Sequence, residues 1–163
     1  MTKLNVGLVV LAFGVAVGAP TPARAQDQCK PVVGSFEAHL VFDGCTSPVG
    51  LCTAGRVWGG LQGTYQFVMS DLTASGRPTA AQPLATIMFF GGDSKVTLKS
   101  GDLLPGEDTG AIDLARGGFA SLITFHGGTG AAANASGQIR LRGEYDPVAG
   151  TTSGDYIGSI CMP

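Results

Sequence analysis

Apolar and polar residues alternate along short segments of this chain, and glycine-rich stretches separate these segments. Residues 35–43 show the pattern most clearly, since Phe36, Ala38, Leu40 and Phe42 take every second position. Successive side chains of a strand point to opposite faces of its sheet, so this pattern predicts a strand with one buried and one wetter face. A helical repeat is nearly absent from the rest of the chain, which favours an all-β fold.

The other predicted strands bring the total to about eight or nine. They cover residues 56–58, 61–72, 84–90, 95–99, 110–114, 119–125, 138–145 and 155–161. Glycine, proline and serine mark the connections, which are a turn at 91–93 and loops at 45–55, 73–83 and 103–109. The 73–83 loop is the longest, and we expect it to be mobile, as a lid would be. Residues 84–90 are apolar on both faces and therefore favour an outer cover, which a loop, a chain terminus or another subunit would supply.

The N-terminal residues 1–25 have the features of a secretory signal peptide. Lys3 supplies the positive charge, residues 6–18 form the apolar run, and Ala23 and Ala25 supply the small residues of a cleavage site. The apolar run is too short to span a bilayer. We therefore expect removal of residues 1–25, which leaves a single domain at residues 26–163 that is secreted or periplasmic and has no membrane anchor.

The charge of the mature chain excludes some classes of partner. Removal of the signal leaves eight basic and 12 acidic residues, a net charge of −4. A negative protein is a poor match for nucleic acid or for an anionic membrane surface, so neither is expected as a partner.

All four cysteines lie in the mature part, and an even number in an exported chain predicts disulfides. Zinc binding is the alternative, but six residues separate Cys45 from Cys52 and neither histidine is near them in sequence, so no metal is expected. Three connectivities are possible. The simplest joins Cys45 to Cys52 and Cys29 to Cys161. The second bridge requires the two termini to be neighbours, as they are in a closed barrel.

A glycine-rich turn near the C-terminus carries a resemblance to a known family. Its residues are Gly127-Gly128-Thr129-Gly130, followed by Ala135, Gly137-Gln138 and Leu141. The run resembles the turn-and-strand signature of the allene oxide cyclase and dirigent superfamily. The segment from Gly92-Asp93 to Gly101 and the closing segment 146–158 are similar to strands of the same group, which includes small bacterial barrels of unassigned function. A phosphate-binding loop is the alternative, but a strand and not a helix follows, and no Lys does.

The resemblance implies an eight-stranded antiparallel β-barrel with an apolar cavity, often assembled as a trimer. Members of the superfamily cyclise a fatty-acid epoxide or steer the coupling of phenoxy radicals, and no cofactor is implied. The cyclases take carboxylate, Asn and Pro groups from their early strands. The early strands of this chain do not match that pattern, but Glu37 lies in the corresponding region. Glu37 is therefore the candidate catalytic residue.

The strand alternation gives a different expectation for the same region. Glu37 and His39 share the face opposite Phe36 and Leu40, so they are expected to point outward, toward solvent or a subunit interface. His126 precedes the glycine turn and is expected at the barrel rim. The side chains expected to contact a ligand inside the barrel are Trp58, Tyr65, Phe67, Met69 and Phe90.

Two functions are compatible with these observations. The first is an exported barrel, without a cofactor, that binds a small apolar or aromatic molecule or acts as an assembly module. The second is a cofactor-free isomerase or cyclase that confines its substrate in a dry pocket, with Glu37 polarising it.

Overall fold

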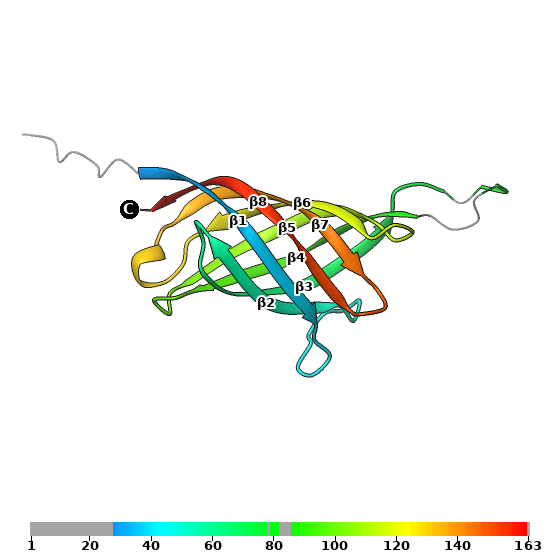
Figure 1. Ribbon diagram of the computed structural model, residues 1–163, viewed down its shortest axis with the longest axis horizontal. Helices are drawn as coiled ribbons and strands as arrows, with labels where there is room; N and C mark the ends of the chain where they lie inside the picture. Colours follow the sequence, from blue (N-terminus) through cyan, green and yellow to red (C-terminus); the bar gives the residue numbers. More distant parts are fainter. Residues whose placement is uncertain (1–27, 78, 82–85, 163) are drawn as a thin grey trace, which may run out of the picture.

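The computed structural model describes residues 28–77, 79–81 and 86–162, and these form one closed antiparallel β-barrel (Figure 1). Its strands are β1 (Gln28–Leu40), β2 (Cys52–Gly59), β3 (Gly63–Ala74), β4 (Ile87–Leu98), β5 (Leu103–Asp113), β6 (Gly118–His126), β7 (Ser136–Asp146) and β8 (Thr151–Met162). Each strand pairs with the next, and β1 pairs with β8. The predicted eight-stranded all-β barrel is confirmed, whereas the predicted signal peptide, residues 1–25, lies outside the described residues.

Two disulfides fasten the barrel, and both predicted pairings are confirmed. Cys29 on β1 is the register partner of Cys161 on β8, and the two are bonded, so this bridge fastens the seam where the barrel closes. Cys45 and Cys52 are bonded across the connection between β1 and β2.

The core is the barrel interior, and the alternation of each strand determines which side chains fill it. Phe36 and Ala38 are buried as expected, and Leu40 is half-buried. The prediction for Phe42 is wrong, because β1 ends at Leu40 and Phe42 is 78% exposed in the following connection.

Two predicted breaks in strands are also wrong. Strand β4 runs straight through residues 91–93, and β5 includes the whole of the predicted loop 103–109. Packing explains both cases. A Cβ atom at Gly92 would lie 2.6 Å from Cε2 of Phe67, and one at Gly106 would lie 2.8 Å from Cγ2 of Ile123. These glycines make room for large side chains of neighbouring strands, so they mark tight packing inside a strand and not its end.

The region predicted as a long loop and the segment after it are only partly described. Thr73 and Ala74 of the predicted 73–83 loop belong to β3, and positions 78, 82 and 83 lie outside the described residues. On the outer face of β4, Ile87 is 36% and Phe89 is 53% exposed. The described residues therefore do not supply the outer cover that was expected for this strand.

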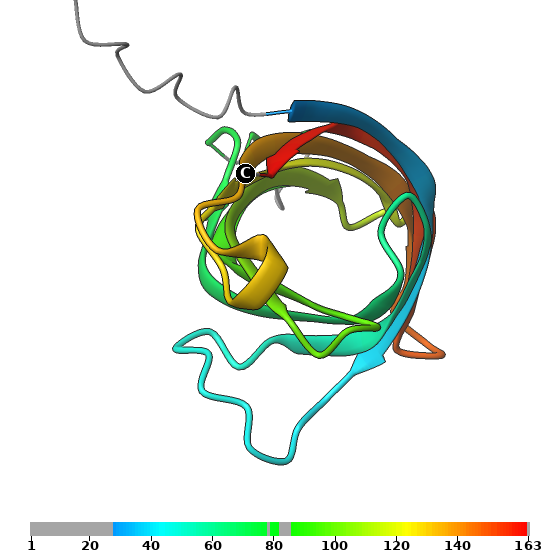
Figure 2. The same ribbon diagram turned by 90° about the vertical axis from the view of Figure 1, so that its left-hand side faces the viewer.

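The two ends of the barrel differ. At one end, called the closed end, the connection between β6 and β7 contains a short 3₁₀ helix, η1 (Gly130–Ala132), which lies over one side of the barrel end (Figure 2). Ala132 and Ala135 of this connection are almost completely buried. Gly127 adopts a φ of 77°, which suits glycine. The opposite end, called the mouth, carries the connections that follow β1, β3, β5 and β7.

Candidate functional site

The half of the barrel next to the mouth contains an open cavity of about 110 Å³. Aromatic side chains form much of its wall, including Phe36 of β1, Phe67 of β3, Phe90 of β4 and Phe119 of β6. Their rings meet edge-on or tilted: the Phe67 and Phe90 centroids are 5.9 Å apart, and those of Phe36 and Phe119 are 6.1 Å apart. The cavity is therefore a preformed apolar pocket, smaller than the roughly 300–1,000 Å³ of typical drug-sized ligand sites.

Four of the five residues predicted to contact a ligand line this cavity. They are Tyr65, Phe67, Met69 and Phe90. Trp58 does not line the cavity, so the prediction that it contacts a ligand inside the barrel is wrong. Val57 points into the core and is 5% exposed, so alternation sends the next side chain, Trp58, to the outer face, where it is 41% exposed.

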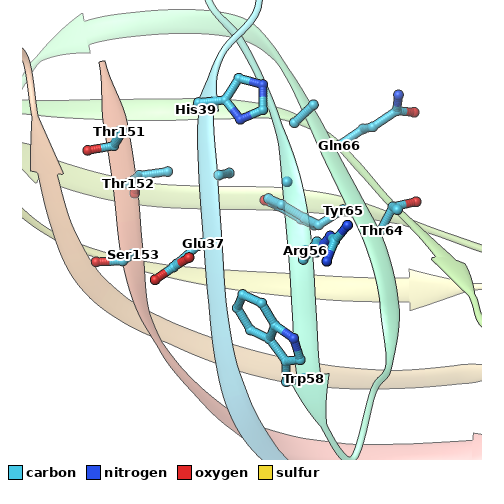
Figure 3. Close-up of a pocket in the computed structure, with 13 residues that line it drawn as sticks. Glu37, His39, Arg56, Trp58, Thr64, Tyr65, Gln66, Thr151, Thr152 and Ser153 are labelled. Carbon is cyan, nitrogen blue, oxygen red and sulfur yellow. The ribbon is translucent and has the colours of Figure 1, made fainter. Parts of the chain in front are cut away.

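The predicted catalytic residue, Glu37, also lies outside the cavity. Glu37 and His39 are exposed on the outer face of β1, as their alternation predicted. Figure 3 shows them beside Arg56 and Trp58 of β2, where they line an open outer groove of about 890 Å³. The barrel wall separates Glu37 from the cavity, so this carboxylate cannot polarise a molecule bound inside. His126 is exposed at the end of β6, near the closed end.

A different carboxyl, Asp108 of β5, lies at the inner end of the cavity. Asp108 is 3% exposed, and its Oδ2 accepts hydrogen bonds from the hydroxyls of Ser94, at 3.2 Å, and Tyr65, at 3.4 Å. The Tyr65 and Ser94 oxygens are 3.0 Å apart, which places the three groups in one cluster. The other carboxyl oxygen, Oδ1, is buried and has no hydrogen-bond partner among the residues that the structure describes. Oδ1 therefore meets no donor at hydrogen-bond geometry, although the Ser121 hydroxyl lies beside the carboxyl.

The surroundings of Asp108 oppose its ionisation. Burial raises the pKa of the carboxyl from 3.8 to about 6, while the hydroxyls of Ser121, Ser94 and Tyr65 act in the opposite direction. Burial and the neighbouring carboxylate also raise the pKa of the Tyr65 hydroxyl far above its usual 10, so Tyr65 remains a neutral hydrogen-bond donor. At neutral pH, Asp108 is therefore mostly ionised at a cost in free energy.

No positive side chain in the described part of the chain compensates the charge of Asp108. Every Lys, Arg and His within the described ranges is exposed, on the outer face or on a connection. Asp108 is also the sole buried residue among the Asp, Glu, Lys, Arg and His side chains that the structure describes.

The sequence contained a signal for Asp108 that the predicted loop concealed. Pro105 and Gly106 suggested a connection at 103–109, so the alternation of this segment was not followed. As a strand, it places Leu104, Asp108 and Ile112 on one face. A single carboxyl on an otherwise apolar face would have singled out Asp108.

The chemistry that this site offers is hydrogen bonding and proton transfer. An ionised Asp108 accepts a hydrogen bond or a proton at Oδ1, and the protonated form returns the proton. Within the described ranges, no three His, Cys, Asp or Glu side chains gather where they would share a metal ion. In the same residues, no helix is long and apolar enough to cross a membrane.

The chain was compared with protein-family models and with curated proteins. No protein-family model matches the chain, and a search of the curated proteins found no match.

Proposed function

We propose that this protein is an exported barrel that binds a small apolar or aromatic molecule in the cavity at its mouth. The observation that carries the proposal is the buried Oδ1 of Asp108, which meets no donor at hydrogen-bond geometry among the described residues, in an otherwise apolar pocket. A buried carboxylate without a full set of partners is costly to a fold, and such groups are concentrated at functional sites. A bound molecule would supply the missing partner.

The size of the cavity suits a compact ligand. An apolar cavity of roughly 150 Å³ holds one benzene molecule, and the cavity here measures about 110 Å³ and is open at the mouth. The cavity is smaller than that, so a single six-membered ring is the largest body expected, and part of it would lie in the open mouth. No cofactor is needed for this role.

A pair of neighbouring threonines on β8 tests the proposal. Thr152 lines the cavity, whereas Thr151 is exposed on the outer face. We expect Thr152→Trp to fill the mouth and weaken the binding of toluene at least about tenfold, in line with the loss of about 1.4 kcal/mol. Thr151→Trp adds the same bulk to the same strand and is expected to leave toluene binding unchanged. Titration calorimetry of both variants measures this, and equal toluene affinities in the two variants would contradict the proposed site.

The second candidate function is a cofactor-free isomerase or cyclase, as the superfamily resemblance implies. Asp108 favours it, because a carboxyl with a pKa of about 6 in a dry pocket is suited to take up and return a proton near neutral pH. In this role Asp108 replaces Glu37 as the candidate group. A binding protein returns its ligand unchanged and an isomerase does not, so mass spectrometry or chromatography of the recovered molecule separates the two functions.

A further inference from the structure

The interior of the barrel has an unbalanced charge. The carboxylate of Asp108 receives hydrogen bonds from the hydroxyls of Tyr65 and Ser94, which are neutral donors. Ser121 of β6 also lies beside the carboxyl and carries no charge. These groups solvate the carboxylate but leave its negative charge uncompensated, since the described Lys, Arg and His side chains are all exposed.

The walls around this charge are suited to a cation as well. Phe36, Phe67, Phe90 and Phe119 surround the cavity. The face of an aromatic ring is negative and attracts a cation that has lost part of its hydration. An aromatic pocket with one carboxylate at its inner end therefore favours a positively charged group over a neutral or negative one.

We propose that the ligand is an organic amine: a protonated primary or secondary ammonium group on a small apolar or aromatic body. The ammonium donates to Oδ1 of Asp108 and the body lies among the aromatic side chains. This inference rests on the proposed binding function and specifies its ligand class. A neutral alcohol would satisfy Oδ1 but leave the charge uncompensated, and a carboxylic acid would be repelled by Asp108.

Three probes of similar shape test the proposal, namely toluene, benzyl alcohol and benzylamine. With the wild-type protein at pH 8, titration calorimetry is expected to show benzylamine binding at least tenfold more tightly than the other two. Asp108→Asn should weaken benzylamine binding by about 10- to 100-fold, the range expected for loss of a hydrogen bond to a charged group. The far-UV circular dichroism spectrum of this variant should match that of the wild type, which shows that the variant is folded.

The pH dependence of the wild-type protein gives a second readout that needs no variant. An aliphatic amine remains protonated between pH 5 and 7, whereas Asp108, with a pKa of about 6, gains a proton as the pH falls through this range. The neighbouring Tyr65, Ser94 and Ser121 hydroxyls do not titrate here. Benzylamine affinity should therefore fall about tenfold from pH 7 to pH 5, with toluene affinity constant.

The outcomes separate the two proposals. If toluene binds but benzylamine binds no more tightly and shows no pH dependence, the amine proposal is wrong and the proposed binding function stands. If benzyl alcohol binds most tightly of the three, the cavity recognises a neutral donor and the amine proposal is again wrong. If none of the three probes binds, both the amine proposal and the proposed binding function are wrong.

Discussion

Removal of the Cys29–Cys161 disulfide is expected to lower the free energy of unfolding by about 5 kcal/mol. The two cysteines are 132 residues apart in sequence, so their bond restricts nearly the whole unfolded chain. In the chain-entropy account, the stabilisation grows with the logarithm of the closed loop, and a loop of about 100 residues corresponds to about 4.7 kcal/mol. Urea unfolding of Cys29→Ser/Cys161→Ser, with the other disulfide intact, measures the loss.

The matched control is Cys45→Ser/Cys52→Ser. Its cysteines are only 7 residues apart, so the same account gives a loss of roughly 2.5 kcal/mol. In Cys29→Ser/Cys161→Ser, the pairing of β1 with β8 should also open before the rest of the barrel. Hydrogen exchange of the backbone amides of those two strands would reveal this. Equal losses in the two variants would show that restriction of the unfolded chain is not what the terminal bridge contributes.

The second large effect concerns pH and Asp108. The pKa of this carboxyl is about 6 in the folded protein, above its usual 3.8, so the folded state holds the proton more tightly than the unfolded state. Unfolding between these pH values releases a proton, and stability therefore falls as the pH rises. The contribution of Asp108 should be fully present below about pH 4 and lost above pH 6, a change of about 3 kcal/mol.

The variant Asp108→Asn isolates this effect, because other titrating groups are common to both proteins. The unfolding free energy of the wild type, minus that of the variant, is expected to fall by about 3 kcal/mol between pH 4 and pH 7.5. Any effect of the asparagine amide on the unfolding free energy that does not depend on pH cancels when the values at the two pH values are compared. Denaturant titrations across the range provide the values, and a difference that stays constant with pH would mean that Asp108 is not a buried, disfavoured carboxylate.

The cost of Asp108 bears on function. Asparagine or an apolar residue would spare the fold an uncompensated charge, so the carboxyl is not explained by stability. Its position at the inner end of the cavity gives it another use, which is recognition or proton transfer. Stability and function would then oppose each other at this one residue.

Much of the fold was predictable because strand alternation is strong where large apolar residues repeat. Phe36 and Ala38 of β1 and Tyr65, Phe67 and Met69 of β3 follow it and are buried. The disulfides were predictable because an even set of cysteines in a closed barrel has one simple pairing. Prediction failed where glycines lie inside strands, as at Gly92 and Gly106, since a glycine in sequence does not show whether it marks a turn or makes room for a neighbouring ring.

For the candidate site, the sequence predicted only the apolar side chains that line the cavity. Four of the side chains that line the cavity could be predicted from their apolar character, namely Tyr65, Phe67, Met69 and Phe90. The prediction for Trp58 is wrong, because the predicted strand at 56–58 is too short to show which of its side chains face inward. Asp108 is not predicted for a related reason, since the sequence pattern predicts a loop at residues 103–109. A polar residue becomes notable only when its face is known, and the face depends on strand boundaries that proline and glycine obscure.

In the native compartment, the cavity that ends at Asp108 is expected to hold a small molecule. The most direct test of this expectation is mass spectrometry of small molecules that co-purify with the wild-type protein and with Thr152→Trp, both isolated from that compartment under the same conditions. A small amine is expected to be enriched with the wild type and lost from the variant. An identical set of molecules with both proteins, or none with either across repeated preparations, would contradict it.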